Sequence, residues 1–200
     1  MKKIITGLVA ALVVVGAGVG FWFFLDSASA AANVGETKIT ASQVNESVKA
    51  IIAERKTVST TGMQLAVGQA LNAEVLNYYV ILTLLTHTAA ANGLTVTPEQ
   101  LTARLAAILR QEGGATILKS KEVSANIAEA DFSGHVRLRL YLEELTSLVE
   151  KNGTSVTNSG TAVQELVRSQ AAKEGVSVNK KYGTWDAKQV TVLAPNVFSK

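Results

Sequence analysis

Residues 75–101 read VLNYYVILTLLTHTAAANGLTVTPEQL, and this stretch decides the fold. No charged side chain occurs between Val75 and Pro98, and residues 75–85 are apolar around nearly the whole circumference of a helix. A helix without a polar face lies either in a protein core or in a membrane. Polar residues interrupt the stretch from Asn77 onward, and no basic and aromatic flank follows it. We therefore expect a central core helix.

The boundaries of this helix come from its neighbours in the sequence. A helix is predicted from Met63 to Ala91, because Asn92-Gly93 is a common C-terminal signal. Thr97 then has the position of an N-cap, with proline at the first helical position and Gln100 at the second position of a capping box. This second helix is expected to end at the glycine pair 113–114.

Outward from this centre, the chain is predicted to be mostly α, a multi-helix domain with short N- and C-terminal strands. Apolar residues at helical spacing predict four further helices, which begin after Thr40, lie within 117–129, and span 132–151 and 161–174. Residues 154–160 are predicted to be a polar linker. The segments 34–39 and 176–178 are predicted to be short strands that pair with each other, since a lone strand leaves its backbone groups unpaired.

The N-terminus carries an export signal. Lys2 and Lys3 precede an uncharged run from Ile4 to Leu25, and an Ala-x-Ala site follows at residues 28–30. A cleaved signal peptide has this order of features, whereas the length of the run is that of a membrane-spanning helix. Both interpretations, a signal peptide or a membrane anchor over residues 1–31, place the rest of the chain outside the cytoplasm. The domain is predicted over 32–189, with a tail over 190–200.

Composition excludes several classes of function. The 200 residues have room for about one domain, and 48% of them are hydrophobic and 18% charged, which suits a packed core. A formal charge of +3 gives no reason to expect nucleic acid as a partner. The chain has no cysteine, so disulfides, thiolate catalysis and cysteine-based zinc sites are impossible.

The sequence offers no catalytic motif. His87 and His135 are far apart and neither has the spacing of a zinc protease motif. The sequence also lacks a Gly-x-Ser-x-Gly nucleophile elbow and a phosphate-binding Walker loop. The chain is therefore predicted not to be an enzyme and to have no catalytic residue, metal or cofactor.

Three segments resemble the SurA- and PrsA-like foldases. They are VGETKIT at 34–40, AANGLTVTPEQL at 90–101 and VSVNKKYGTWD at 176–186, and the last is the most specific. The order of the segments around the predicted helices is also similar to that family. The resemblance covers residues 34–186 and implies a SurA N-terminal-like chaperone domain that binds unfolded or exported polypeptides outside the cytoplasm.

The chain departs from the full-length foldases in one informative place. Those proteins carry a parvulin prolyl isomerase domain before the final helix, whereas residues 151–160 here are too few to hold one. Asn179-Lys180 also lacks the proline that usually follows the asparagine. The resemblance therefore implies client binding without prolyl isomerase activity.

A chaperone of this kind needs a concave apolar surface that accepts extended client segments. The candidate client-binding residues lie on two of the predicted helices: Tyr78, Tyr79, Leu82, Leu138, Tyr141 and Leu142. The same helical spacing is also that of core residues, so both interpretations stay open at this stage. An alternative function is an envelope-anchored adaptor that binds one specific folded partner.

Overall fold

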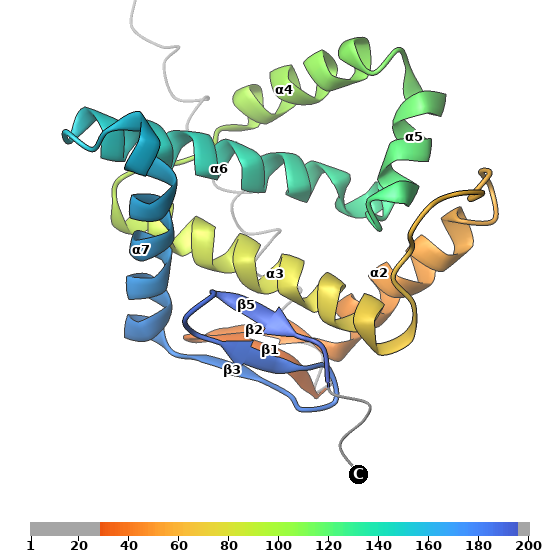
Figure 1. The fold of residues 1–200 in the computed structure, drawn as a ribbon, viewed down its shortest axis with the longest axis horizontal. Coiled ribbons are helices and arrows are strands. Elements are labelled where there is room, and N and C mark those ends of the chain that lie inside the picture. Colours follow the sequence, from red (N-terminus) through yellow and green to blue (C-terminus); the bar gives the residue numbers. More distant parts are fainter. Residues whose placement is uncertain (1–28, 196–200) are drawn as a thin grey trace, which may run out of the picture.

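Helix α3 (Gly68–Ala91) lies at the centre of the domain, with the other elements arranged around it (Figure 1). The structure is a computed structural model and describes residues 29–195. Helices α2 (Ala41–Glu54), α6 (Phe132–Lys151) and α7 (Val156–Glu174) contact α3, and so do three of the short strands. The predicted export segment, residues 1–31, falls almost entirely outside the described residues.

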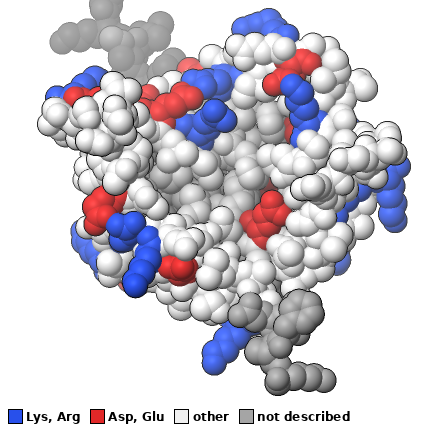
Figure 2. Space-filling view, viewed as in Figure 1, with Lys and Arg blue, Asp and Glu red and all other residues white. Residues whose placement is uncertain are grey.

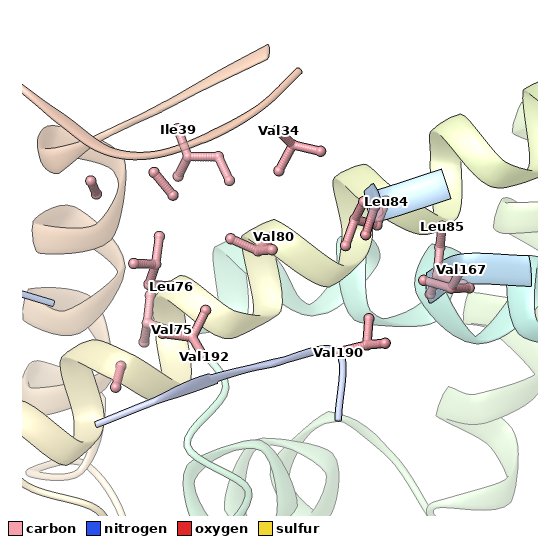
Figure 3. Close-up of a cluster of buried hydrophobic side chains, with 14 of the residues drawn as sticks. Val34, Ile39, Val75, Leu76, Val80, Leu84, Leu85, Val167, Val190 and Val192 are labelled. Carbon is pink, nitrogen blue, oxygen red and sulfur yellow. The ribbon is translucent and has the colours of Figure 1, made fainter. Parts of the chain in front are cut away.

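The core confirms that α3 is a buried helix. Leu76, Val80 and Leu84 are fully buried, and in Figure 3 these side chains of α3 lie between Val34 and Ile39 on one side and Val190 and Val192 on the other. Among the helices of residues 29–195, none has both the length and the hydropathy of a membrane span. The helix without a polar face is thus covered by the protein itself.

The first and last predicted strands pair, as expected. Strand β1 (Ala30–Val34) lies between β2 (Thr37–Thr40) and β3 (Val176–Val178), and both partners run antiparallel to it. Val34 pairs directly with Val176. The turn between β1 and β2 contains Gly35, whose φ of +56° is costly for residues with a side chain. The Gly35 amide also donates to the Gly175 carbonyl at 2.9 Å, which ties the two ends of the fold together.

A second hairpin closes the other side of α3. Strands β4 (Thr184–Asp186) and β5 (Thr191–Leu193) pair antiparallel, and the Asn77 side-chain oxygen accepts hydrogen bonds from the Val192 amide at 2.8 Å and the Thr191 hydroxyl at 3.1 Å. The predicted tail from residue 190 is therefore wrong, because Val190 and Val192 are buried in the core. The predicted domain start at residue 32 is also too late, since β1 begins at Ala30.

Two helices begin at other residues than predicted. Helix α3 begins at Gly68 rather than Met63, because Val67 is extended and Arg55 holds the preceding Ala66 carbonyl at 2.8 Å. Helix α7 begins at Val156 rather than Thr161, so most of the predicted polar linker is helical. Ser159 explains this start, since its side chain is buried in the first turn and donates to the Val156 carbonyl at 2.9 Å.

The remaining helices follow their sequence signals. Helix α4 (Pro98–Gln111) has the predicted capping box at Thr97 and Gln100. The weak pattern over 117–129 corresponds to α5 (Ala115–Ser124), which is followed by a single 3₁₀ turn, η2 (Glu129–Asp131). Local signals alone are therefore sufficient for these elements.

Truncation after Glu174 should unfold the whole domain. The truncation removes β3, which pairs with β1 along one edge of the sheet, and also the buried residues Tyr182, Val190 and Val192. Each large buried side chain contributes about 2–5 kcal/mol, and a domain has about 5–15 kcal/mol in total. We expect the truncated protein to lose its cooperative thermal transition in circular dichroism. An unfolding midpoint equal to that of the full chain would show that the C-terminal strands do not close the fold.

Candidate functional site

Helices α4 and α5 form an arm that stands away from α3 and faces α6 (Figure 1). Helix α4 is amphipathic, yet none of its residues is buried; its apolar stripe of Leu101, Leu105 and Ile108 is only half-buried. The polar contacts to α6 are exposed: Arg104 pairs with Glu143 at 2.8 Å and Gln100 meets Glu144 at 3.3 Å. Exposed pairs of this kind contribute little stability, so the arm is weakly held.

The arm and α6 leave large apolar side chains in contact with solvent. Leu109 on α4 is 42% exposed, Ile117 on α5 50%, and Leu142 on α6 38%. In Figure 2 this face of the molecule is hollowed near its centre, beneath the arm, and the surface inside the hollow is mostly uncharged. Lys, Arg, Asp and Glu lie mainly around its rim. Exposed apolar side chains next to a largely uncharged hollow have the character of a protein-binding surface.

Three buried side chains of α5 and α6 lie outside the main core. Val123 of α5 and Val136 and Leu140 of α6 are buried, but they do not belong to the main core around α3. No residue of α4 or α5 belongs to the main core. The arm is therefore expected to open at a lower free energy than the core helices.

The structure separates the six predicted client-binding residues into two groups. Tyr141 is a core residue, only 8% exposed, and Tyr79 and Leu138 pack against the same core. Tyr78, Leu82 and Leu142 do not belong to this packing. Tyr78 and Leu82 lie where α3 approaches α6, since a Cβ atom at Gly134 would collide with the Tyr78 hydroxyl and touch Leu82. Of the six, Leu142 is the one that offers a large exposed apolar surface.

A polar cluster joins α2, α3 and α6 beside this approach. The Asp131 carboxylate accepts hydrogen bonds from the Ser47 hydroxyl and, at 2.8 Å, from the Tyr79 hydroxyl. The Tyr78 ring stacks on His135 with 3.9 Å between the ring centroids and 8° between the planes. The tyrosines that were candidates for client binding are thus engaged inside the protein.

Burial controls the protonation of this cluster. It raises the pKa values of Tyr78 and Tyr79 above their ordinary range, with the Asp131 charge as a further cause, so both phenols are neutral. Burial also lowers the pKa of His135 to about 4, against the opposing effect of Asp131. The His135 ring is therefore neutral at pH 7 and its contact with Tyr78 is a stack of two uncharged rings.

The cavity at this cluster is too small to be a client groove. It has a volume of about 50 Å³, against about 300–1,000 Å³ for small-molecule sites. Its lining includes Ser47, Tyr78, Asp131 and His135. The cluster is best explained as a structural connection between three helices.

The described part of the chain has no cluster of metal-binding side chains. Within residues 29–195, no three His, Asp or Glu side chains are placed to hold a metal ion. His87 has a structural role, because its Nδ1 atom lies 2.8 Å from a Glu174 carboxylate oxygen and links α3 to α7. Each histidine thus has a partner within the fold.

Sequence reasoning missed the arm as the main apolar surface. The apolar stripe of α4 and the neighbouring Leu109 were visible as helical periodicity, but periodicity indicates only that one face is apolar and not that another element covers it. Ile117 lies in a segment with a weak helical pattern. The glycine pair at 113–114, which separates the two apolar segments, was the available signal of a projecting helix pair.

Comparison with known families agrees with this architecture. The model of the SurA-like N-terminal domain matches residues 1–146, which run from the N-terminus to the second half of α6. The chain belongs to this family. The predicted family is thereby confirmed, and it is chaperone-like and typically extracytoplasmic. Neither a curated protein nor a solved structure matches the chain. In this SurA-like protein α7 and strands β3–β5 follow the matched region.

His135 should make this SurA-like domain less stable in mild acid. The pKa of histidine is about 6.5 in the unfolded chain, and that of folded His135 is about 4. Between these values only the unfolded state takes up the proton, so stability falls as the pH drops from 6.5 toward 4. The loss is roughly 2 kcal/mol once partial solvent screening is allowed for.

The measurement is urea unfolding at a series of pH values. The matched variant His135→Phe keeps a ring against Tyr78 but cannot titrate. We expect a shallower loss of unfolding free energy in this variant between pH 6.5 and 4. Equal slopes in the two proteins would contradict a buried neutral His135.

Proposed function

We propose that this protein is an extracytoplasmic chaperone that holds unfolded or exported polypeptides and prevents their aggregation. The observation that carries the proposal is the α4–α5 arm, whose apolar stripe on α4 is only half-buried and whose Leu109 and Ile117 side chains are exposed. Membership in the SurA-like family supports it. A holding function needs only such a surface and no catalytic group.

The expected affinity follows from the size of this surface. Apolar contact contributes about 25 cal/mol per Å², from which the cost of ordering the client is subtracted. The exposed residues Leu109, Ile117 and Leu142 are few, so binding should be weak, in the micromolar range. Because apolar contact supplies most of this affinity, salt should have little effect on it.

The proposed location rests on the N-terminal sequence. The basic pair at residues 2–3 and the uncharged run over 4–25 would direct the domain across the cytoplasmic membrane. If the run is retained, residues 4–25 are also the membrane contact of the protein. The partners are therefore polypeptides and, in that case, lipid, but not nucleic acid.

The proposal does not include prolyl isomerisation. Helix α6 ends at Lys151 and α7 begins at Val156, so four residues join the two helices where the foldases carry a parvulin domain. An isomerase domain has no room in that turn. This supports a function that depends on binding alone.

Client holding is tested with a matched pair of variants. Leu109, Ile117 and Leu142 are replaced by serine together; the control is Val156→Ser, because Val156 is 77% exposed on α7, away from the arm. Exposed positions change stability little, so all proteins should fold. We expect the triple variant to bind an unfolded model substrate about tenfold more weakly, the equivalent of about 1.4 kcal/mol, while the control is unchanged.

The readouts are light scattering of an aggregating substrate at near-stoichiometric chaperone and thermal unfolding of each variant. Failure of the unmodified domain to slow aggregation of any substrate would overturn the holding function and favour the adaptor with one folded partner. Equal losses in the triple variant and the Val156 control would instead show that the arm is not the binding surface.

The absence of isomerisation is tested separately. The pure domain should not accelerate cis–trans isomerisation of a proline-containing peptide, because a binding surface alone does not lower a barrier of about 18–20 kcal/mol. A protease-coupled peptide assay measures this rate. Acceleration that survives repeated purification would show that the domain has an isomerase site of its own.

A further inference from the structure

The Ala-x-Ala site at residues 28–30 runs directly into the first strand of the domain. Cleavage at this site would break the Ala30–Ala31 bond. Strand β1 begins at Ala30, so this bond is the first peptide bond of β1. The domain therefore starts with no spacer after the site.

Strands lie on both sides of this bond, and the β1–β2 register shifts between Ala30 and Ala32, so that Ala31 itself has no partner residue in β2. β1 is the middle strand of its sheet, where Ala30 pairs with Thr40 of β2, and the Ala31 carbonyl accepts from the Asn179 amide at 2.9 Å. Two further hydrogen bonds depend on residues before the bond. The Ser29 carbonyl accepts from the Ala41 amide at 3.1 Å, and the Ala30 carbonyl accepts from the Asn179 side chain at 3.3 Å.

Burial adds to this protection. Ala31 and Ala32 belong to the main hydrophobic core and are almost completely inaccessible. A protease binds its substrate as an extended strand with free backbone groups. In the folded domain the carbonyls of Ser29, Ala30 and Ala31 already accept hydrogen bonds from Ala41 and Asn179. To expose the bond, β1 must leave the centre of its sheet, which costs a large part of the global unfolding free energy.

The local part of this structure can form early. β1 and β2 are joined by a two-residue turn, and β2 leads directly into the capping box of α2 at Thr40 and Gln43. A hairpin forms in about 1–10 µs, whereas synthesis delivers about 5–20 residues per second. The pairing of Ala30 with Thr40 therefore competes with cleavage before the chain is complete.

We infer that the Ala30–Ala31 bond is protected by strand β1 and is not cleaved, so that residues 1–30 remain attached to the domain. The export segment then acts as a tether that holds the chaperone next to the membrane. This inference rests on the export component of the proposed function and does not depend on client binding.

The test compares the unmodified full chain with a variant that has a flexible Gly/Ser linker of about ten residues between Ala30 and Ala31. The linker moves the Ala-x-Ala site out of the strand without changing it. Both proteins carry a C-terminal tag, are produced in a bacterium, and are analysed by intact mass. A third protein, the linker variant with Ala28→Lys, shows whether a cut depends on this site.

We expect the unmodified chain to keep residues 1–30, the linker variant to lose them, and the third protein to stay intact. An unmodified protein that begins at Ala31 would overturn the inference. Retention in both the unmodified chain and the linker variant would also overturn it, since the strand would not be the cause. Export is checked by adding external protease to spheroplasts. A C-terminal tag that stays protected would show that the domain is not exported, and this inference would then fail as well. The aggregation assay for client binding is independent of this result.

Discussion

The fold depends on the fact that α3 has no polar face. Its fully buried residues Leu76, Val80 and Leu84 point in one direction, and other apolar side chains cover the remaining directions. A helix of this kind must be enclosed on all sides to be stable in water. The two ends of the chain help to provide that enclosure, because β1, β2 and β5 all contact α3. The N- and C-terminal strands must therefore pack on α3 for this helix to be buried.

This requirement explains why so much of the fold could be predicted. Caps such as Thr97 with Gln100 are local, and their outcome does not depend on the rest of the chain. The pairing of residue 34 with 176 followed from the need of two short strands for backbone partners. The starts of α3 and α7 were mispredicted because tertiary contacts fix them: Arg55 holds the loop before α3, and burial of Ser159 extends α7.

The candidate site was less predictable, for a related reason. Periodicity identifies an apolar face but not the element that covers it. Tyr79 and Tyr141 have the residue type of a binding surface, yet the Tyr79 hydroxyl donates to Asp131 of η2, and Tyr141 is packed in the core. Leu109 and Ile117 looked like ordinary helix residues and are left exposed by the arm. Which apolar face lacks a partner is a property of the tertiary structure and is not encoded in any single segment.

Stability and proposed function are thus located in different parts of the molecule. Apolar surface that is already buried in the core contributes its free energy to folding and has none left for a client. The surface around α4 and α5 differs from the core. The apolar stripe of α4 is half-buried, and the polar contacts from α4 to α6 are exposed. Burial of this surface against a partner would therefore still release free energy. Because the enclosed α3 and its strands maintain the fold, the proposed binding surface lies on the part of the domain whose movement costs the fold least.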